Sequence, residues 1–102
     1  MQIDHAKIRR EQLRWLILLA LNNARPQGCY EQLVLATAQA IYPDATALEV
    51  RREMDYLDDR KLLRIRKEPG GKWWAELIRY GIDMVEYTID CAPGIARPEK
   101  YW

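Results

Sequence analysis

The sequence lacks the residue patterns from which most active sites and metal centres are built. It has 102 residues with a single histidine, His5, and no HxxxH, CxxC, GxSxG or GxxxxGK(S/T) pattern occurs in it. A zinc site needs three or four ligands, and the sequence offers His5 no such partners. We therefore expect no enzymatic activity, no bound metal and no cofactor.

Cysteines and long apolar runs are also scarce. The two cysteines, Cys29 and Cys91, lie far apart, so we expect reduced thiols and not a disulfide framework. The most apolar run, residues 13–21, is about half the length needed to cross a bilayer. Asp4 and Glu11 precede it, and no small-residue cleavage site follows, which disfavours a signal peptide. We expect a cytoplasmic protein with no membrane partner.

The sequence also lacks a large excess of positive or negative charge. Sixteen Lys and Arg residues against fifteen Asp and Glu residues give a net charge of +1. Hydrophobic residues make up 49% and charged residues 30%, which is typical of one ordinary globular domain. Dedicated nucleic-acid binders are usually more basic, so only the local distribution of charge can indicate DNA binding.

Three helices are expected in the first 61 residues. The first covers about residues 4–23, and one of its faces carries Leu13, Leu16, Ile17, Ala20 and Leu21. The second covers about residues 30–42, ends before Pro43, and has an expected inner side of Leu33, Ala36, Thr37, Ala40 and Ile41. The third begins at Thr46, which has capping-box spacing with Glu49. Its expected inner face carries Ala47, Val50, Met54 and Leu57.

The first helix is apolar on two sides. Its second apolar face carries Trp15, Leu18 and Leu19. A surface helix needs only one apolar face, so the second face needs a cover, either the C-terminal region or a second copy of the chain. We expect a homodimer whose interface contains these three residues, with Tyr101 and Trp102 folding across it.

A hairpin is expected after the third helix. Residues 62–67 alternate apolar and basic side chains, and residues 72–78 form the returning strand after a Pro-Gly-Gly turn. Arg64 and Arg66 therefore lie on one side of the hairpin, opposite Leu63 and Ile65.

The whole pattern predicts a mainly α fold with a small, two-stranded β-hairpin. A short fourth helix over about residues 80–87 completes one domain, residues 1–88, and an irregular extended tail covers residues 89–102. We expect a single core formed by the inner faces of the helices and the hairpin. Its centre is expected at Leu16, Ile17, Leu33, Val50, Met54, Leu57, Ile65 and Leu77.

The order helix, helix, helix, hairpin resembles the winged-helix superfamily, in which a helix-turn-helix carries a β-hairpin wing. The likeness covers about residues 5–88. It rests on the capped third helix, the Leu-Asp-Asp-Arg-Lys-Leu-Leu segment of residues 57–63 and the Gly-Gly hairpin. Lys61 stands where a glycine is common in winged-helix repressors. The chain is also similar to small winged-helix proteins of Mu-like prophages, through Gly-Ile-Asp after the wing and Pro-Gly-Ile-Ala-Arg-Pro in the tail.

The resemblance implies a DNA-binding protein, a regulator of phage or prophage type. The third helix would enter the major groove, and the wing would lie along the backbone or in the minor groove. Arg52 is suited to a bidentate contact with guanine, and Thr46 and Tyr56 to contacts with phosphates. The wing contacts are expected from Arg64, Arg66, Lys67 and Lys72.

The charge of the third helix keeps an alternative open. Residues 46–61 contain five acids and four bases, whereas phosphate neutralisation is the main source of DNA affinity. A basic hairpin can also be a solvated edge that resists aggregation. The chain would then be a protein-interaction module without DNA contact, which binds through its acidic third helix and aromatic tail. A continuous positive strip from Arg52 to the wing favours DNA, and a strip broken by Glu49, Asp55 and Asp59 favours a protein partner.

Overall fold

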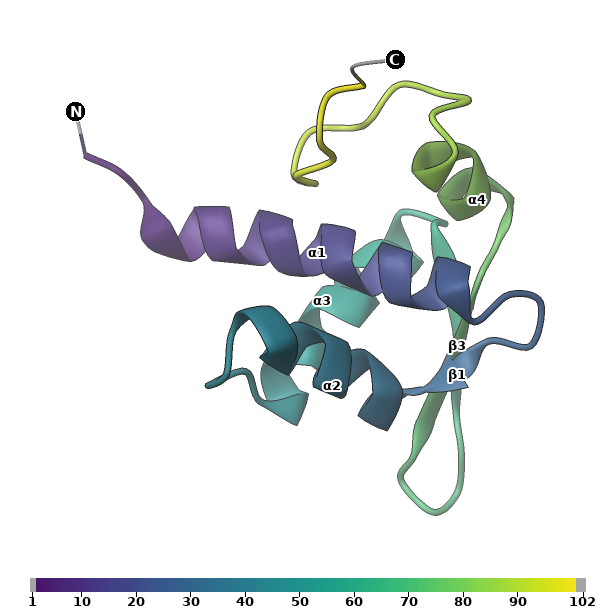
Figure 1. The fold of residues 1–102 in the computed structure, drawn as a ribbon. Coiled ribbons are helices and arrows are strands. Elements are labelled where there is room, and N and C mark those ends of the chain that lie inside the picture. The colour runs from purple at the N-terminus through teal and green to yellow at the C-terminus, as the bar shows by residue number, and fades with distance from the viewer. Residues whose placement is uncertain (1, 101–102) are drawn as a thin grey trace.

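The computed structural model describes residues 2–100, which form a mainly helical domain with a small antiparallel sheet (Figure 1). The elements in chain order are α1 (His5–Asn23), β1 (Cys29–Tyr30), α2 (Glu31–Ile41), α3 (Ala47–Asp59), β2 (Leu63–Lys67), β3 (Trp73–Leu77) and α4 (Arg79–Val85). Helices α1, α2 and α3 pack on one another. The hairpin of β2 and β3, which we call the wing, projects beyond them. The mainly α fold class and the hairpin are thereby confirmed.

The sheet has three strands and not the expected two. Its strand order is β1-β3-β2, and both pairs are antiparallel. Cys29 and Tyr30 pair with Ala75 and Trp74 and so extend the wing on its β3 side. A two-residue strand is too short to show an alternating pattern, so only its pairing with β3 identifies it. The expectation of a two-stranded sheet was therefore wrong by one strand.

The end of α3 explains the unusual residue at position 61. Lys61 has φ +65, in the left-handed region that favours glycine. The amide of Leu62 donates to the carbonyl of Leu57 at 3.0 Å, and the amide of Lys61 donates to the carbonyl of Asp58 at 3.0 Å. These two bonds form a Schellman motif, which ends the helix and starts the chain towards β2. Lys61 thus has the backbone conformation that a glycine would adopt at lower cost.

The expected core centre is confirmed at most positions. Ile17, Val50, Met54 and Leu57 are each at most 1% exposed, and Leu77 is 6% exposed. Two further expected members, Leu16 and Ile65, are half-buried and pack against this core from its edge.

Helix α2 faces the core with a different side from the one expected. Leu33 and Ile41 are 55% and 58% exposed, whereas Glu31, Val34 and Ala38 are buried. The physical reason lies at the first residue of the helix. Glu31 turns inward to pair with an arginine of α3, and Val34 and Ala38 follow it one and two turns later on the same face. Ala36 and Ala40 are therefore exposed, and Leu33 was wrongly placed in the core centre.

Residues 88–100 contain no helix or strand and fold back across α1 (Figure 1). The amide of Ala96 donates to the carbonyl of Glu11 at 3.1 Å, and Ile95 is only 8% exposed. The described part of the tail is thus packed on the domain.

The second apolar face of α1 is covered largely from within the chain. Leu18 is 0% exposed and belongs to the core, so its assignment to a dimer interface was wrong. Trp15 is half-buried, and its ring meets that of Tyr87 edge-on at 6.4 Å between centroids. Leu19 is also half-buried. Tyr101 and Trp102, the other expected interface residues, lie outside the described residues.

Candidate nucleic-acid interface

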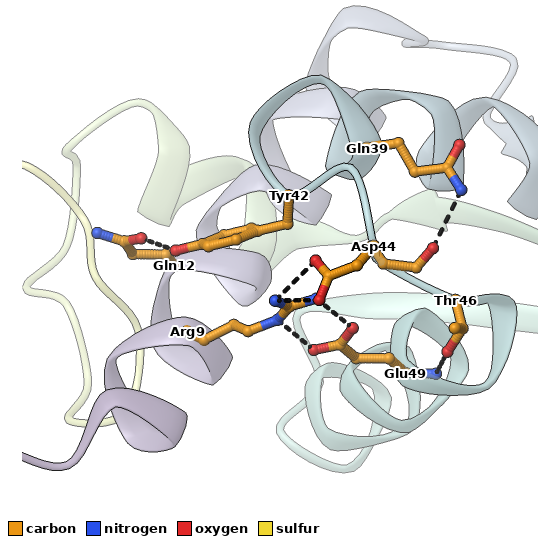
Figure 2. Close-up of polar contacts among 8 residues, drawn as sticks. Arg9, Gln12, Gln39, Tyr42, Asp44, Thr46 and Glu49 are labelled. Atoms are coloured by element: carbon orange, nitrogen blue, oxygen red, sulfur yellow. Dashed lines mark hydrogen bonds and ion pairs between the residues drawn. The ribbon is translucent and has the colours of Figure 1, made fainter.

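The N-terminal turn of α3 carries an acid that is neutralised by a base from α1. Thr46 caps the helix, because its hydroxyl oxygen accepts a hydrogen bond from the amide of Glu49 at 3.2 Å. Arg9 donates to both carboxylate oxygens of Glu49 at 2.7 and 2.9 Å, and to Asp44 at 3.0 Å (Figure 2). These hydrogen bonds raise the pKa of the Arg9 guanidinium. Glu49 therefore presents little free negative charge at this end of the helix.

A second acid of α3 points away from the outer surface. Glu53 is 5% exposed and accepts a hydrogen bond from Arg14 of α1 at 2.7 Å. Arg14 also donates to the carbonyl of Gly94 in the tail at 2.9 Å. The pair links α1, α3 and the tail, and it removes Glu53 from any surface that could meet a phosphate backbone.

Arg52 is exposed on the outer face of α3, and within residues 2–100 it has no hydrogen bond or ion pair. Its neighbour Arg51 is engaged instead. Arg51 forms a two-point ion pair with Glu31 of α2, and its guanidinium donates to the carbonyl of Gly71 in the wing turn at 2.6 Å. The same Glu31 carboxylate accepts a weaker bond from the amide of Trp73 at 3.4 Å.

This cluster, Glu31 with Arg51, positions the wing relative to α3, because it joins both to α2. The hydrogen bonds from Arg51 lower the pKa of Glu31, so the pair stays charged at neutral pH. The sequence interpretation missed the cluster. A signal for it exists, since Glu31 is the only charged residue in α2.

Arg64 and Arg66 lie on the outer side of the wing, and both are paired with acids. Arg66 stacks on the ring of Trp74 at 4.3 Å and lies 3.3 Å from the carboxylate of Glu68. The stacking is a cation–π contact across the hairpin. Arg64 pairs with Glu76, directly opposite it on β3.

Two further wing bases differ in their contacts. Lys67 lies 3.8 Å from Asp55 of α3 and 4.4 Å above the ring of Trp73. Lys72 is exposed and forms no ion pair with any residue of the range 2–100. It lies 5.7 Å above the ring of Tyr30.

Tyr30 ties β1 to the tip of the wing. Its hydroxyl donates to Glu68 at 2.6 Å. That bond lowers the pKa of Glu68, with a smaller contribution from Arg66, and it raises the pKa of the Tyr30 phenol. Glu68, the single acid of the wing turn, is therefore hydrogen-bonded by Tyr30 and paired with Arg66.

Tyr56, an expected phosphate contact, is partly covered by its neighbours. Its ring is half-buried, with the guanidinium of Arg14 at 3.5 Å and that of Arg60 at 4.3 Å from the centroid. The tail covers it too, because a Cβ built on Gly94 would stand 2.3 Å from its hydroxyl oxygen. The sequence alone could not show this cover, and the expected contact of Tyr56 with a phosphate stays a prediction.

The outer surface of α3 and the wing is therefore mixed in charge. It is positive at Arg52 and Lys72 and neutral between α3 and the wing, where Asp55 meets Lys67. Asp59 is exposed at the C-terminal end of the helix. Of the acids weighed against DNA binding, Glu49 is paired with a base and Asp55 is close to one.

Residues 2–100 bring together no group of three His, Cys, Asp or Glu side chains able to hold a metal ion. No helix in that range is long and apolar enough to cross a bilayer. No protein-family model and no curated protein matches the chain.

Proposed function

We propose that this chain is a winged-helix DNA-binding protein, a regulator of phage or prophage type. In this proposal, α3 enters the major groove and the wing lies on the backbone or in the minor groove. Three helices followed by a hairpin beside the third helix are compatible with that layout. The phage or prophage assignment rests on the sequence resemblance alone.

The observation that carries the proposal is the pairing of two acids of α3, Glu49 and Glu53, with bases of α1. The sequence alone counted five acids against four bases, a balance that opposes binding to phosphates. Arg9 neutralises Glu49, and Arg14 withdraws Glu53 into the interior. The N-terminal half of the outer face then presents Arg52 without a competing free carboxylate.

The ion pairs of the wing do not weigh heavily against this proposal. The side chains of Arg64 and Lys67 are 66% and 59% exposed. Exposed ion pairs contribute about 0–1 kcal/mol, so a phosphate can replace the carboxylate at small cost. The wing remains available as a sequence-independent contact, whereas Arg52 would read the bases.

Two observations favour a second candidate, a protein-interaction module. The positive strip from Arg52 to the wing is interrupted at Asp55, which is the pattern expected for a protein partner. The outer face of α2 carries Leu33 and Ile41, both more than half exposed, and helix residues 32–41 contain no charged side chain. Interface centres are depleted of charge and contain apolar side chains. A partner protein would contact α2, and α3 would then not need to enter DNA.

A titration with labelled duplex DNA separates the two candidates. Replacing Arg66 with glutamine should weaken binding to all duplexes alike and reduce the salt slope of log K by about 0.9. Replacing Arg52 with glutamine should cost about 1–3 kcal/mol at the preferred site and flatten the preference between sites. Arg79→Gln is the control, because Arg79 is an exposed base at the start of α4. If none of these proteins binds duplex DNA, the interaction module takes the place of this proposal.

A further inference from the structure

A cavity opens where the end of α3, helix α4 and the tail meet. Its volume is about 340 Å³, at the lower end of the range of small-molecule sites. Its apolar lining consists of Leu62, Met84, Ile89 and Ala92. Leu62 and Met84 are each 3% exposed and belong to the core, and Ile89 and Ala92 of the tail pack against it. A wall of this kind suits an aliphatic or aromatic group of a few carbons.

Two opposite charges line the same cavity. Arg60 and Asp90 both border it, and neither has an ion-pair partner within residues 2–100. The guanidinium of Arg60 is held above the ring of Tyr56 at 4.3 Å, which limits its freedom. Tyr80, 59% exposed, adds a phenol at the edge. The cavity therefore offers a cation, an anion and an apolar wall together.

The geometry points to a binding site for a small zwitterion with an apolar side chain, that is, an apolar α-amino acid. Arg60 would take the carboxylate, since guanidinium and carboxylate form strong charge-assisted hydrogen bonds. Asp90 would take the ammonium group, and the apolar wall would take the side chain. This site is separate from the proposed DNA surface, and the inference does not depend on DNA binding.

The charge pattern selects this class over simpler amphiphiles. A fatty or aryl carboxylate would satisfy Arg60 but would bring an anion near Asp90. An alkyl amine would satisfy Asp90 and bring a cation near Arg60. A ligand that carries both charges and an apolar group matches both side chains, whereas each unmatched charge costs affinity when it loses water.

The test uses the full chain labelled with nitrogen-15 and carbon-13, titrated with L-leucine and L-phenylalanine while NMR shifts are followed. We expect saturable shifts at Met84, Ile89 and Ala92. Two stripped analogues, 4-methylpentanoate without the amine and 3-methylbutylamine without the carboxylate, should bind at least about tenfold more weakly than L-leucine. Equal binding of either analogue would overturn the assignment of a zwitterion.

Variants locate the site and provide controls. Arg60→Gln and Asp90→Asn should each weaken L-leucine binding by about tenfold or more. Arg79→Gln and Glu99→Gln, which remove exposed charges that do not line the cavity, should leave it unchanged. Because Arg60 follows α3 directly and its loss could disturb that turn, Ala92→Leu serves as a second test that fills the cavity from its wall. It should abolish the shifts while the rest of the spectrum stays that of the folded protein.

Three results would overturn the inference. One is the absence of shifts at Met84, Ile89 and Ala92 with both amino acids at about 10 mM, where even weak sites are occupied. The second is a set of shifts centred elsewhere on the molecule. The third is unchanged binding of L-leucine in Ala92→Leu.

Discussion

Lys67 of the wing lies 3.8 Å from Asp55 of α3, at the place where the two parts of the proposed DNA surface meet. Both side chains are more than half exposed, so the contact can break when a phosphate competes. The pair also explains why the surface is not a continuous positive strip. Asp55 offsets the wing base that stands nearest to α3.

Removing this acid should strengthen DNA binding. Asp55→Asn frees Lys67 and removes one negative charge facing the duplex. We expect tighter binding to random duplex and a steeper salt dependence than in the wild type. Anisotropy titrations at two salt concentrations measure both quantities.

The control is Glu99→Gln, which changes the net charge by the same amount as Asp55→Asn. Glu99 is exposed and lies in the tail. Equal affinities of Asp55→Asn and Glu99→Gln would show that Asp55 does not face the DNA.

Acid should weaken the attachment of the wing through Glu31. Its pKa is lowered from the ordinary value of 4.5, chiefly by the hydrogen bonds from Arg51. A carboxyl whose pKa is lower in the folded state stabilises the fold above the ordinary value, and that contribution is lost as pH falls through the folded pKa. Urea unfolding of wild type and Glu31→Gln, followed by tryptophan fluorescence, should therefore differ most at neutral pH.

The difference in unfolding free energy between these two proteins should shrink as pH falls below 4.5. A difference that is the same at neutral and at acid pH would mean that the Glu31 charge does not contribute.

Lys61 should be replaceable by glycine with a gain in stability. An L-residue in the left-handed region costs about 1–2 kcal/mol, and the added freedom of glycine in the unfolded chain offsets about half of this, so we expect a net gain of about 0.5–1 kcal/mol. Chemical denaturation measures it.

Lys61→Ala separates the backbone effect from the loss of charge, because alanine keeps the Cβ. It should give no comparable gain. A Lys61→Gly protein no more stable than Lys61→Ala would contradict the backbone explanation.

Local patterns predicted the order of the elements because caps and breakers act over a few residues. Thr46 with Glu49 marked the start of α3, and the Gly-Gly turn marked the wing, both with boundaries correct to about one residue. Arg64 and Arg66 share the outer side of the hairpin as expected, because alternation alone decides the side of a strand.

Other features depend on contacts between residues that are far apart in the sequence, and local patterns do not predict these contacts. The buried side of α2 depends on Glu31 meeting Arg51, and apolar content alone pointed to Leu33 instead. Tyr56 was expected on the outer side of α3, and only the returning tail shows that it is partly covered. The pairing of Glu49 with Arg9 joins residues 40 positions apart, so a count of charges along α3 could not include it.

The homodimer stays a prediction, and the structure changes the surface that it would use. Leu18 is in the core, whereas Ile41 is 58% exposed beside an apolar groove bordered by Trp15 and Leu16. A charge-free face suits a twofold contact, because it brings no like charges together. Sedimentation should show twice the 12.1 kDa chain mass for wild type and the single mass for Ile41→Glu.

Leu48→Glu is the matched control for the dimer, since Leu48 is 60% exposed but lies on α3. It should remain dimeric. A wild-type protein that sediments as a monomer at micromolar concentration would contradict the dimer prediction.

The most direct test of DNA binding is the salt dependence of wild-type binding to random duplex DNA. Four wing bases, Arg64, Arg66, Lys67 and Lys72, are exposed, and in the proposal each of them neutralises a phosphate. Each phosphate contact contributes about −0.9 to the slope of log K against log salt, so the account predicts a slope of about −3.6. A duplex that does not bind even at low ionic strength, or binding that does not change with salt, would contradict it.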